Sequence, residues 1–147
     1  MKKNILMSKK KKITKAILQK KEKRKLKREF KEKLNRWKEQ VIIRDNNTCQ
    51  RCFKDMTNFN KHVHHIISFQ AVKRKYPKLL ENINNGILLC GQCHKFNSDS
   101  PHQGGFEFTL WFMKNKKNQY NYLKNYLYNL VVQALPLSFK INKGGVK

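Results

Sequence analysis

Two Cys-x-x-Cys pairs, Cys49–Cys52 and Cys90–Cys93, constrain this chain most strongly, because they contain all of its cysteines. Each such turn presents two thiolates to one ion, and two turns complete a closed tetrahedral zinc site. Two disulfides are the alternative, but they need an oxidising compartment, and the apolar run at residues 5–7 is too short for a secretory signal peptide. A redox pair is a second alternative that does not explain two pairs. The pattern therefore predicts a structural zinc held by four thiolates.

The 37 residues between the two pairs exceed the spacing of an ordinary zinc ribbon, so the sequence predicts an insertion between two zinc knuckles. This insertion carries the adjacent histidines His64 and His65, and a third histidine, His94, directly follows Cys93. A neutral imidazole can bind a divalent metal or take a proton near neutral pH. Taken alone, each histidine is more often a surface or packed residue than a catalytic one. Their arrangement nevertheless favours a second metal site.

The order and spacing of these cysteines and histidines, together with one asparagine, resemble the HNH endonuclease family, which has the ββα-metal fold. The residues that carry the resemblance are Cys49-x-x-Cys52, His64-His65-Ile66, Asn85 and Cys90-x-x-Cys93-His94. The likeness covers residues 37–112, and a looser likeness over residues 93–111 points to a phage-type branch of the family. The resemblance implies an α+β fold with a small ββα-metal core and a four-cysteine structural zinc.

The resemblance also implies a role for each residue of the motif. His65 matches the general base that takes a proton from the attacking water, and Asn85 matches the residue that orients this base. His64 and His94 match the ligands of a catalytic divalent ion, with Mg²⁺, Mn²⁺ or Ni²⁺ as candidates. Because His64 stands where the family often has aspartate, the site is less anionic and Zn²⁺ joins these candidates. Adjacent residues of a strand point to opposite faces, so His64 and His65 converge only if the strand twists or bulges.

Weaker candidates accompany these residues. Asn97 and His102 are less favoured metal ligands, and Asn82 and Asn84 compete with Asn85 for the asparagine of the motif.

The charge of the chain points to its partner. Its 147 residues include 34 basic and 9 acidic ones, which gives a formal net charge of +25. Such a charge indicates a polyanion, with DNA as the leading candidate. A membrane surface is the weaker alternative, because the chain has no long apolar segment. The predicted phosphate contacts are Arg44, Arg51, Lys73, Arg74 and Lys75.

Apolar residues recur at helical spacing before the zinc pairs and predict a helix over residues 13–43. The stripe consists of Leu26, Phe30, Leu34, Trp37 and Val41. We expect its C-terminal half to pack on the zinc domain; a coiled coil is the alternative. The Lys-rich residues 1–12 are expected to be disordered, as a DNA-binding arm or a solubilising tail. The predicted organisation is a basic arm and helix (1–36), an HNH nuclease domain (37–112), and a C-terminal helix with a basic tail (113–147).

Shorter elements are predicted within and after the insertion. Strands are expected at residues 63–69 and 87–89, a short basic helix at 71–76, and the motif helix from Cys90 to Asn97. Four apolar residues between 106 and 112 alternate as in a strand, but the family resemblance favours a helix over about residues 106–115. A final apolar stripe predicts a helix from Leu123 to Ala134, closed by Pro136.

Together these observations predict a metal-dependent endonuclease that hydrolyses DNA, and the resemblance implies 5′-phosphate and 3′-hydroxyl products. The alternative is a zinc-containing nucleic-acid-binding module without catalysis, which does not explain why the histidines and Asn85 occur together. Homing, packaging and restriction roles are not distinguished, and a long recognition site would require the N-terminal helix, a homodimer or an accessory protein. A composition rich in Lys, Asn and Ile indicates an AT-rich genome, so we expect a cytoplasmic location in a bacterial or phage-infected cell.

Overall fold

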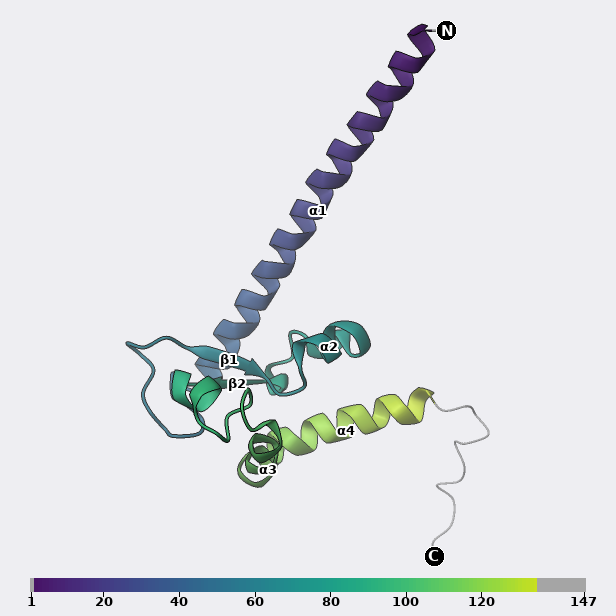
Figure 1. Ribbon diagram of the computed structural model, residues 1–147. Coiled ribbons are helices and arrows are strands. Elements are labelled where there is room, and N and C mark those ends of the chain that lie inside the picture. Colours follow the sequence, from purple (N-terminus) through teal and green to yellow (C-terminus); the bar gives the residue numbers. More distant parts are fainter. Residues whose placement is uncertain (1, 135–147) are drawn as a thin grey trace, which may run out of the picture.

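The computed structural model describes residues 2–134, with side chains described for residues 17–133. A two-stranded antiparallel sheet of β1 (His62–His65) and β2 (Gly86–Leu89) lies at its centre, with His65 opposite Gly86. Four α-helices surround the sheet (Figure 1): α1 (Lys2–Arg44), α2 (Phe69–Lys75), α3 (Gly105–Asn115) and α4 (Lys117–Ala134). Two short 3-10 turns, η1 (Pro77–Leu79) and η2 (Ile83–Asn85), lead into β2. The α+β class predicted from the sequence is confirmed.

Helix α1 has 43 residues, and most of its length projects away from the rest of the chain (Figure 1). The predicted helix is confirmed, but the expected disorder of residues 1–12 is wrong for residues 2–12, which continue α1. Residues 2–44 contain neither glycine nor proline and are rich in lysine, a good helix former, so no residue interrupts the helix. Side chains 17–28 are all exposed, and Leu26 is 58% exposed, so the packed stripe is shorter than predicted.

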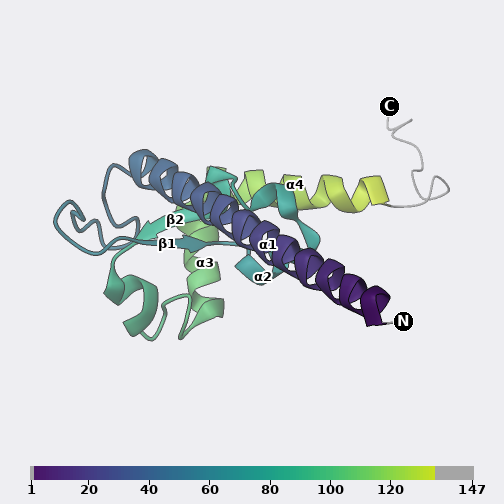
Figure 2. The ribbon, with the colours of Figure 1, turned by 90° about the horizontal axis from the view of Figure 1, so that it is seen from above.

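The last turns of α1 pack on the sheet, as predicted, and cross over it (Figure 2). Trp37 and Val41 are almost fully buried there. A Cβ atom at Gly86 would lie 2.5 Å from Val41 Cγ2 and 2.8 Å from Trp37 Cζ2, so the close approach of helix and strand requires glycine. The indole N–H of Trp37 also donates to the carbonyl of Asn82 at 3.0 Å.

The end of α1 is fixed by Arg44 and Asp45. The guanidinium of Arg44 donates to the Asp45 carboxylate at 2.9 and 3.0 Å and to the carbonyl of Gly86 at 2.8 Å. The buried Asp45 carboxylate also accepts the N–H of Leu88 at 2.8 Å. Arg44 is therefore engaged within the fold, although the sequence suggested it as a phosphate contact.

Strand β1 is shorter than predicted and ends at His65 rather than at residue 69. The backbone turns after His65 because the N–H groups of Ile66 and Ile67 both donate to Asn85, at 2.9 and 2.8 Å. The Ser68 hydroxyl then accepts the N–H of residue 71 at 3.3 Å and caps α2.

The predicted motif helix is a single π-type turn, η3 (Gln92–Phe96), which is closed by a 3.0 Å bond from the Asn97 N–H to the Gln92 carbonyl. Such turns occur frequently at functional sites.

The C-terminal elements form the predicted helices. In α3, Phe108 and Phe112 are buried, whereas Phe106 is 71% exposed, so the helical spacing prevails over the apparent alternation. Helix α4 begins at Lys117, earlier than predicted, and its Leu123 joins the core cluster. Pro136 and the predicted basic tail lie outside the described residues. Among the helices described, none is long and apolar enough to cross a membrane.

Candidate functional site

The four cysteines come together in space, as predicted. All four are free, and their Sγ atoms lie within 4.8 Å of one another. The sulfurs of Cys52 and Cys90 are 3.7 Å apart. Two thiolates bound to one tetrahedral zinc at about 2.3 Å stand about 3.8 Å apart, whereas a disulfide needs about 2.05 Å. The arrangement fits a four-thiolate zinc site rather than disulfides.

Backbone turns shape both knuckles. In the first, the N–H of Phe53 donates to the Cys49 carbonyl at 2.9 Å, and Phe53 has a φ of 59°, a left-handed conformation that favours glycine. In the second, the N–H of Cys93 lies 3.5 Å from the Cys90 sulfur. Burial raises the pKa of Cys93 and of Cys52, so a bound cation is needed to keep these thiols ionised at neutral pH.

Arg51 joins the first knuckle to the loop that precedes α3. Its guanidinium forms an ion pair with the Asp99 carboxylate, donates to the Asp99 carbonyl at 2.6 Å, and lies 5.4 Å from the ring centroid of Trp111. The side chain is only 11% exposed. Arg51, like Arg44, therefore holds the fold together instead of lying free for the predicted phosphate contact.

Three histidines form a second cluster. One ring nitrogen each of His64, His94 and His102 lies within 4.8 Å of the other two, and the Nε2 atoms of His94 and His102 are 3.1 Å apart. Two imidazoles bound to one ion at about 2.0–2.1 Å stand about 2.9–3.4 Å apart, so the spacing fits a shared metal. The fold therefore brings together His64 and His94, both predicted as ligands, with His102, a weaker candidate.

The inner histidines of this cluster are neutral. Burial, together with His94 and His102, lowers the pKa of His64 to about 3. Burial, together with His102 and His62, lowers the pKa of His94 to about 4. Neutral imidazole is the form that binds a metal. The buried Nδ1 of His94 has no hydrogen-bond partner within the described part of the chain, so an ion or a water molecule is expected nearby.

His62 is a member of this region that the motif did not identify. It lies on the same face of β1 as His64, and its ring centroid is 5.1 Å from that of His94 at an interplanar angle of 24°. The sequence signal was the spacing of His62 and His64, which places both side chains on one side of a strand.

His65, the predicted general base, lies on the opposite face of β1. Its ring stacks on Trp37 with the centroids 3.9 Å apart and an interplanar angle of 19°. Its Nε2 lies 3.3 Å from the Leu80 carbonyl; because a carbonyl can only accept, this bond leaves Nδ1 as the basic atom. Burial lowers the pKa of His65. The fold thus does not place His65 in the histidine cluster.

Asn85 is fully buried and links the two segments that hold His65. Its Oδ1 accepts the N–H of Ile67 at 2.8 Å, and its Nδ2 donates to the carbonyl of Leu79 at 3.2 Å. Ile67 lies shortly after His65 in the chain. Leu79 directly precedes Leu80, whose carbonyl bonds the His65 ring. These bonds are compatible with an orienting role for Asn85, which stays a prediction.

The remaining predicted residues occupy simpler positions. Lys73, Arg74 and Lys75 form the exposed last turn of α2, and their role as phosphate contacts stays a prediction. Asn82 caps η2 through the N–H of Asn84 at 2.9 Å.

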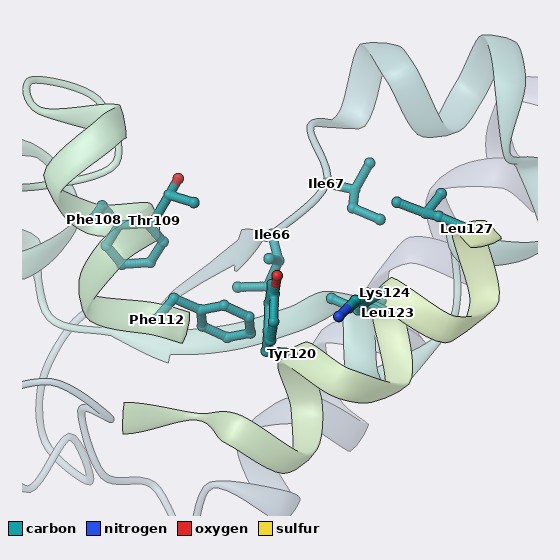
Figure 3. A pocket seen from close by; sticks show the side chains of 9 residues that line it. All are labelled: Ile66, Ile67, Phe108, Thr109, Phe112, Tyr120, Leu123, Lys124 and Leu127. Carbon is teal, nitrogen blue, oxygen red and sulfur yellow. The ribbon is translucent and has the colours of Figure 1, made fainter. Parts of the chain in front are cut away.

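Two hollows border the histidine cluster. The first, of about 370 Å³, is lined mainly by apolar side chains of α3, α4 and the segment after β1 (Figure 3). Phe108 lines it and contacts His64, with ring centroids 5.7 Å apart. The second, of about 400 Å³, is formed by residues of the first knuckle, His62 and η3.

Comparison with known families agrees with this geometry. Residues 49–100 match the family model described as HNH endonuclease. No curated protein and no solved structure matches the chain significantly. The matched segment contains both cysteine pairs, His64, His65, Asn85 and His94. Residues 49–100 therefore match the HNH endonuclease family, and the fold around them is consistent with its small ββα-metal core.

Proposed function

We propose that this protein is a metal-dependent endonuclease that hydrolyses the phosphodiester bonds of DNA. The observation that carries the proposal is the convergence of His64, His94 and His102 beside a separate four-cysteine cluster in an HNH domain. A site with four protein ligands is typically structural, whereas a site with three leaves a position for water or substrate. The formal net charge of +25 supports a polyanionic substrate.

We assign a structural zinc ion to the four cysteines and a catalytic divalent ion to the three histidines. When bound, the catalytic ion acts as a Lewis acid that polarises a phosphoryl oxygen and neutralises developing charge. His64 and His94 offer neutral imidazoles from the interior, and the exposed His102 completes the set from the loop before α3. Mg²⁺ prefers oxygen ligands, so three imidazoles favour Mn²⁺, Ni²⁺ or Zn²⁺ over Mg²⁺.

In this proposal, His65 is the general base. The Leu80 carbonyl holds its Nε2–H, and Nδ1 is then the atom that accepts a proton from the water attacking phosphorus. His65 and the histidine cluster lie on opposite faces of β1, and β1 ends at His65. Both can therefore act on the same scissile phosphate only if that phosphate lies across the end of the strand. Asn85 acts as a positioning residue for the base. The expected products carry a 5′-phosphate and a 3′-hydroxyl.

Exposed basic side chains supply affinity in this proposal without reading the sequence. They comprise Lys73, Arg74 and Lys75 in α2 and the basic residues among positions 17–28 of α1. Recognition of a long DNA site would need contacts from α1, from a second copy of the chain or from an accessory protein. We also propose the cytoplasmic location that was predicted from the sequence.

Plasmid cleavage tests this function. Wild type, His64→Ala, His65→Ala and the exposed control Asn121→Ala are each assayed with EDTA, Mg²⁺, Mn²⁺ and Ni²⁺, after circular dichroism and zinc analysis confirm that they are folded. We expect metal-dependent cutting by wild type and Asn121→Ala, with both histidine variants losing it. Cutting that survives in His65→Ala contradicts its assignment as the base and makes His62 the next residue to test.

The competing function is a zinc-containing nucleic-acid-binding module without catalysis. The position of His65 favours it, because the described part of the chain does not place this predicted base among the three clustered histidines. A folded, zinc-loaded wild type that shifts DNA in a gel but cuts it with none of the metals would establish this module instead.

A further inference from the structure

We infer that the hollow between the first zinc knuckle and η3 binds an unstacked nucleobase of the DNA, beside the histidine cluster. This inference rests on the proposed function, because it places one nucleotide of the substrate next to the proposed metal site. The hollow has a volume of about 400 Å³, within the range of about 300–1,000 Å³ that is usual for small-ligand pockets.

Two phenyl rings from distant segments line the hollow and remain in contact with solvent. Phe59, which follows the first knuckle, is 54% exposed, and Phe96, at the end of η3, is 72% exposed. Neither ring belongs to the core cluster. Aromatic faces are the surfaces on which single-stranded bases stack, and such stacking tolerates any base. Two exposed rings in one hollow are therefore suited to stacking on a nucleobase, and they do not serve only to pack the core.

The polar lining complements a nucleotide as well. The Lys54 ammonium lies over one face of the Phe59 ring, 3.8 Å from its centroid, so the other face remains for a base. Because Lys54 lines the hollow, its positive charge is available to the phosphate of the bound nucleotide. Asn60 and Gln92 place side-chain amides in the lining, and amides can donate to and accept from the edges of a base.

His62 connects the hollow to the proposed metal site. It lines the hollow, and its ring centroid lies 5.1 Å from that of His94. A base held in the hollow therefore belongs to a nucleotide close to the phosphate that the histidine cluster would bind. This position also gives His62 a role as one wall of the base site.

A base that is paired within a duplex cannot enter the hollow without leaving its stack. The cost of unstacking is lowest for a bulged, mismatched or single-stranded base. The inference therefore predicts that the protein prefers DNA with an unpaired nucleotide over fully paired DNA, and that the preference depends on the unpaired base itself and not only on a flexible backbone.

Fluorescence anisotropy at fixed salt and without added divalent metal tests this prediction through binding, separately from cleavage. The probes are a paired duplex, the same duplex with one bulged nucleotide, and the duplex with a bulge that lacks its base. We expect wild type to bind the bulged base about 5- to 160-fold more tightly than the baseless bulge, which is the range expected for stacking of one base.

Substitutions at the hollow complete the test. Phe96→Ala should remove the preference, whereas Phe96→Tyr, which keeps a ring, should retain it. Phe106→Ala is a matched control, because Phe106 is 71% exposed and lies outside the hollow lining. Equal affinity of wild type for the two bulges, or an unchanged preference in Phe96→Ala, would overturn the inference while leaving the nuclease proposal intact. Failure of the proposed function would instead appear as absent plasmid cleavage.

Discussion

The cysteine cluster and the histidine cluster contrast within one small domain. Three of the four cysteines are buried and come from two tight turns, and Arg51 and Asp99 connect the first of these turns to the loop before α3. The histidine cluster has three members from β1, η3 and a loop, and one of them, His102, is exposed. The first site is closed by protein ligands, whereas the second is open on one side.

This difference between the two clusters suits the two proposed roles, a structural zinc site and a catalytic metal site. A metal held by four protein ligands can contribute folding free energy but has no free position for a substrate. A metal held by three neutral imidazoles keeps its charge and has an open position for water or substrate. Variants that affect one cluster and spare the other test this separation directly.

The largest effect is expected for Cys90→Ser. Loss of one thiolate should release the zinc, and because structural zinc binding is worth about 10–16 kcal/mol in small zinc domains, the fold should be lost with it. Zinc content and a thermal melt measure both outcomes. A folded Cys90→Ser protein with a cooperative melt would contradict the assignment of this cluster as structural.

His64→Ala should have the opposite profile. We expect cleavage to fall by more than about 100-fold, because loss of an outer partner of a metal ligand alone typically costs 10- to 100-fold. Its melt and its zinc content should remain near those of wild type, since the cysteine cluster is intact. His102→Ala should lose less activity, because this ligand is exposed. Unfolding of His64→Ala would show that the histidines are structural as well.

Gly86→Ala should lower stability without removing a ligand from either cluster. The new methyl group would overlap Val41 and Trp37, and overpacking of this kind costs about 1–3 kcal/mol. Gly105→Ala is the matched control, because a Cβ there meets no atom within 4 Å. Urea denaturation of both variants provides the comparison, and equal midpoints would show that α1 is not packed tightly on β2.

The smallest effect is expected at the first knuckle. Phe53 is 75% exposed, and its backbone has a left-handed conformation that glycine adopts without steric strain. Phe53→Gly should therefore stabilise the protein by about 0.5–1 kcal/mol and leave cleavage unchanged. The same change in a helix, Phe106→Gly, should destabilise by about 0.5 kcal/mol, because glycine disfavours helix. Denaturation midpoints that move in the same direction for both variants would contradict the backbone explanation.

Several local features could be predicted from the sequence because they depend on spacing alone. The Cys-x-x-Cys turns fix two thiolates within one tight turn, wherever the rest of the chain lies. Helical spacing identified Trp37 and Val41 as the packed face of α1. The orienting role of Asn85 came from the family resemblance rather than from spacing, and it stays a prediction.

The tertiary structure alone decided which histidines meet. Strand pleating separates His64 from His65. Chain folding brings two further histidines to His94: His102, which was only a weak candidate, and His62, which the motif did not include. Whether Arg51 was free for phosphate also depended on Asp99, a carboxylate that only the fold places beside it. Arg44 pairs with its sequence neighbour Asp45, and the fold adds its bond to the carbonyl of Gly86. Spacing along the chain therefore determined the thiolate turns and the helix faces, whereas contacts between distant segments determined the composition of the open histidine site.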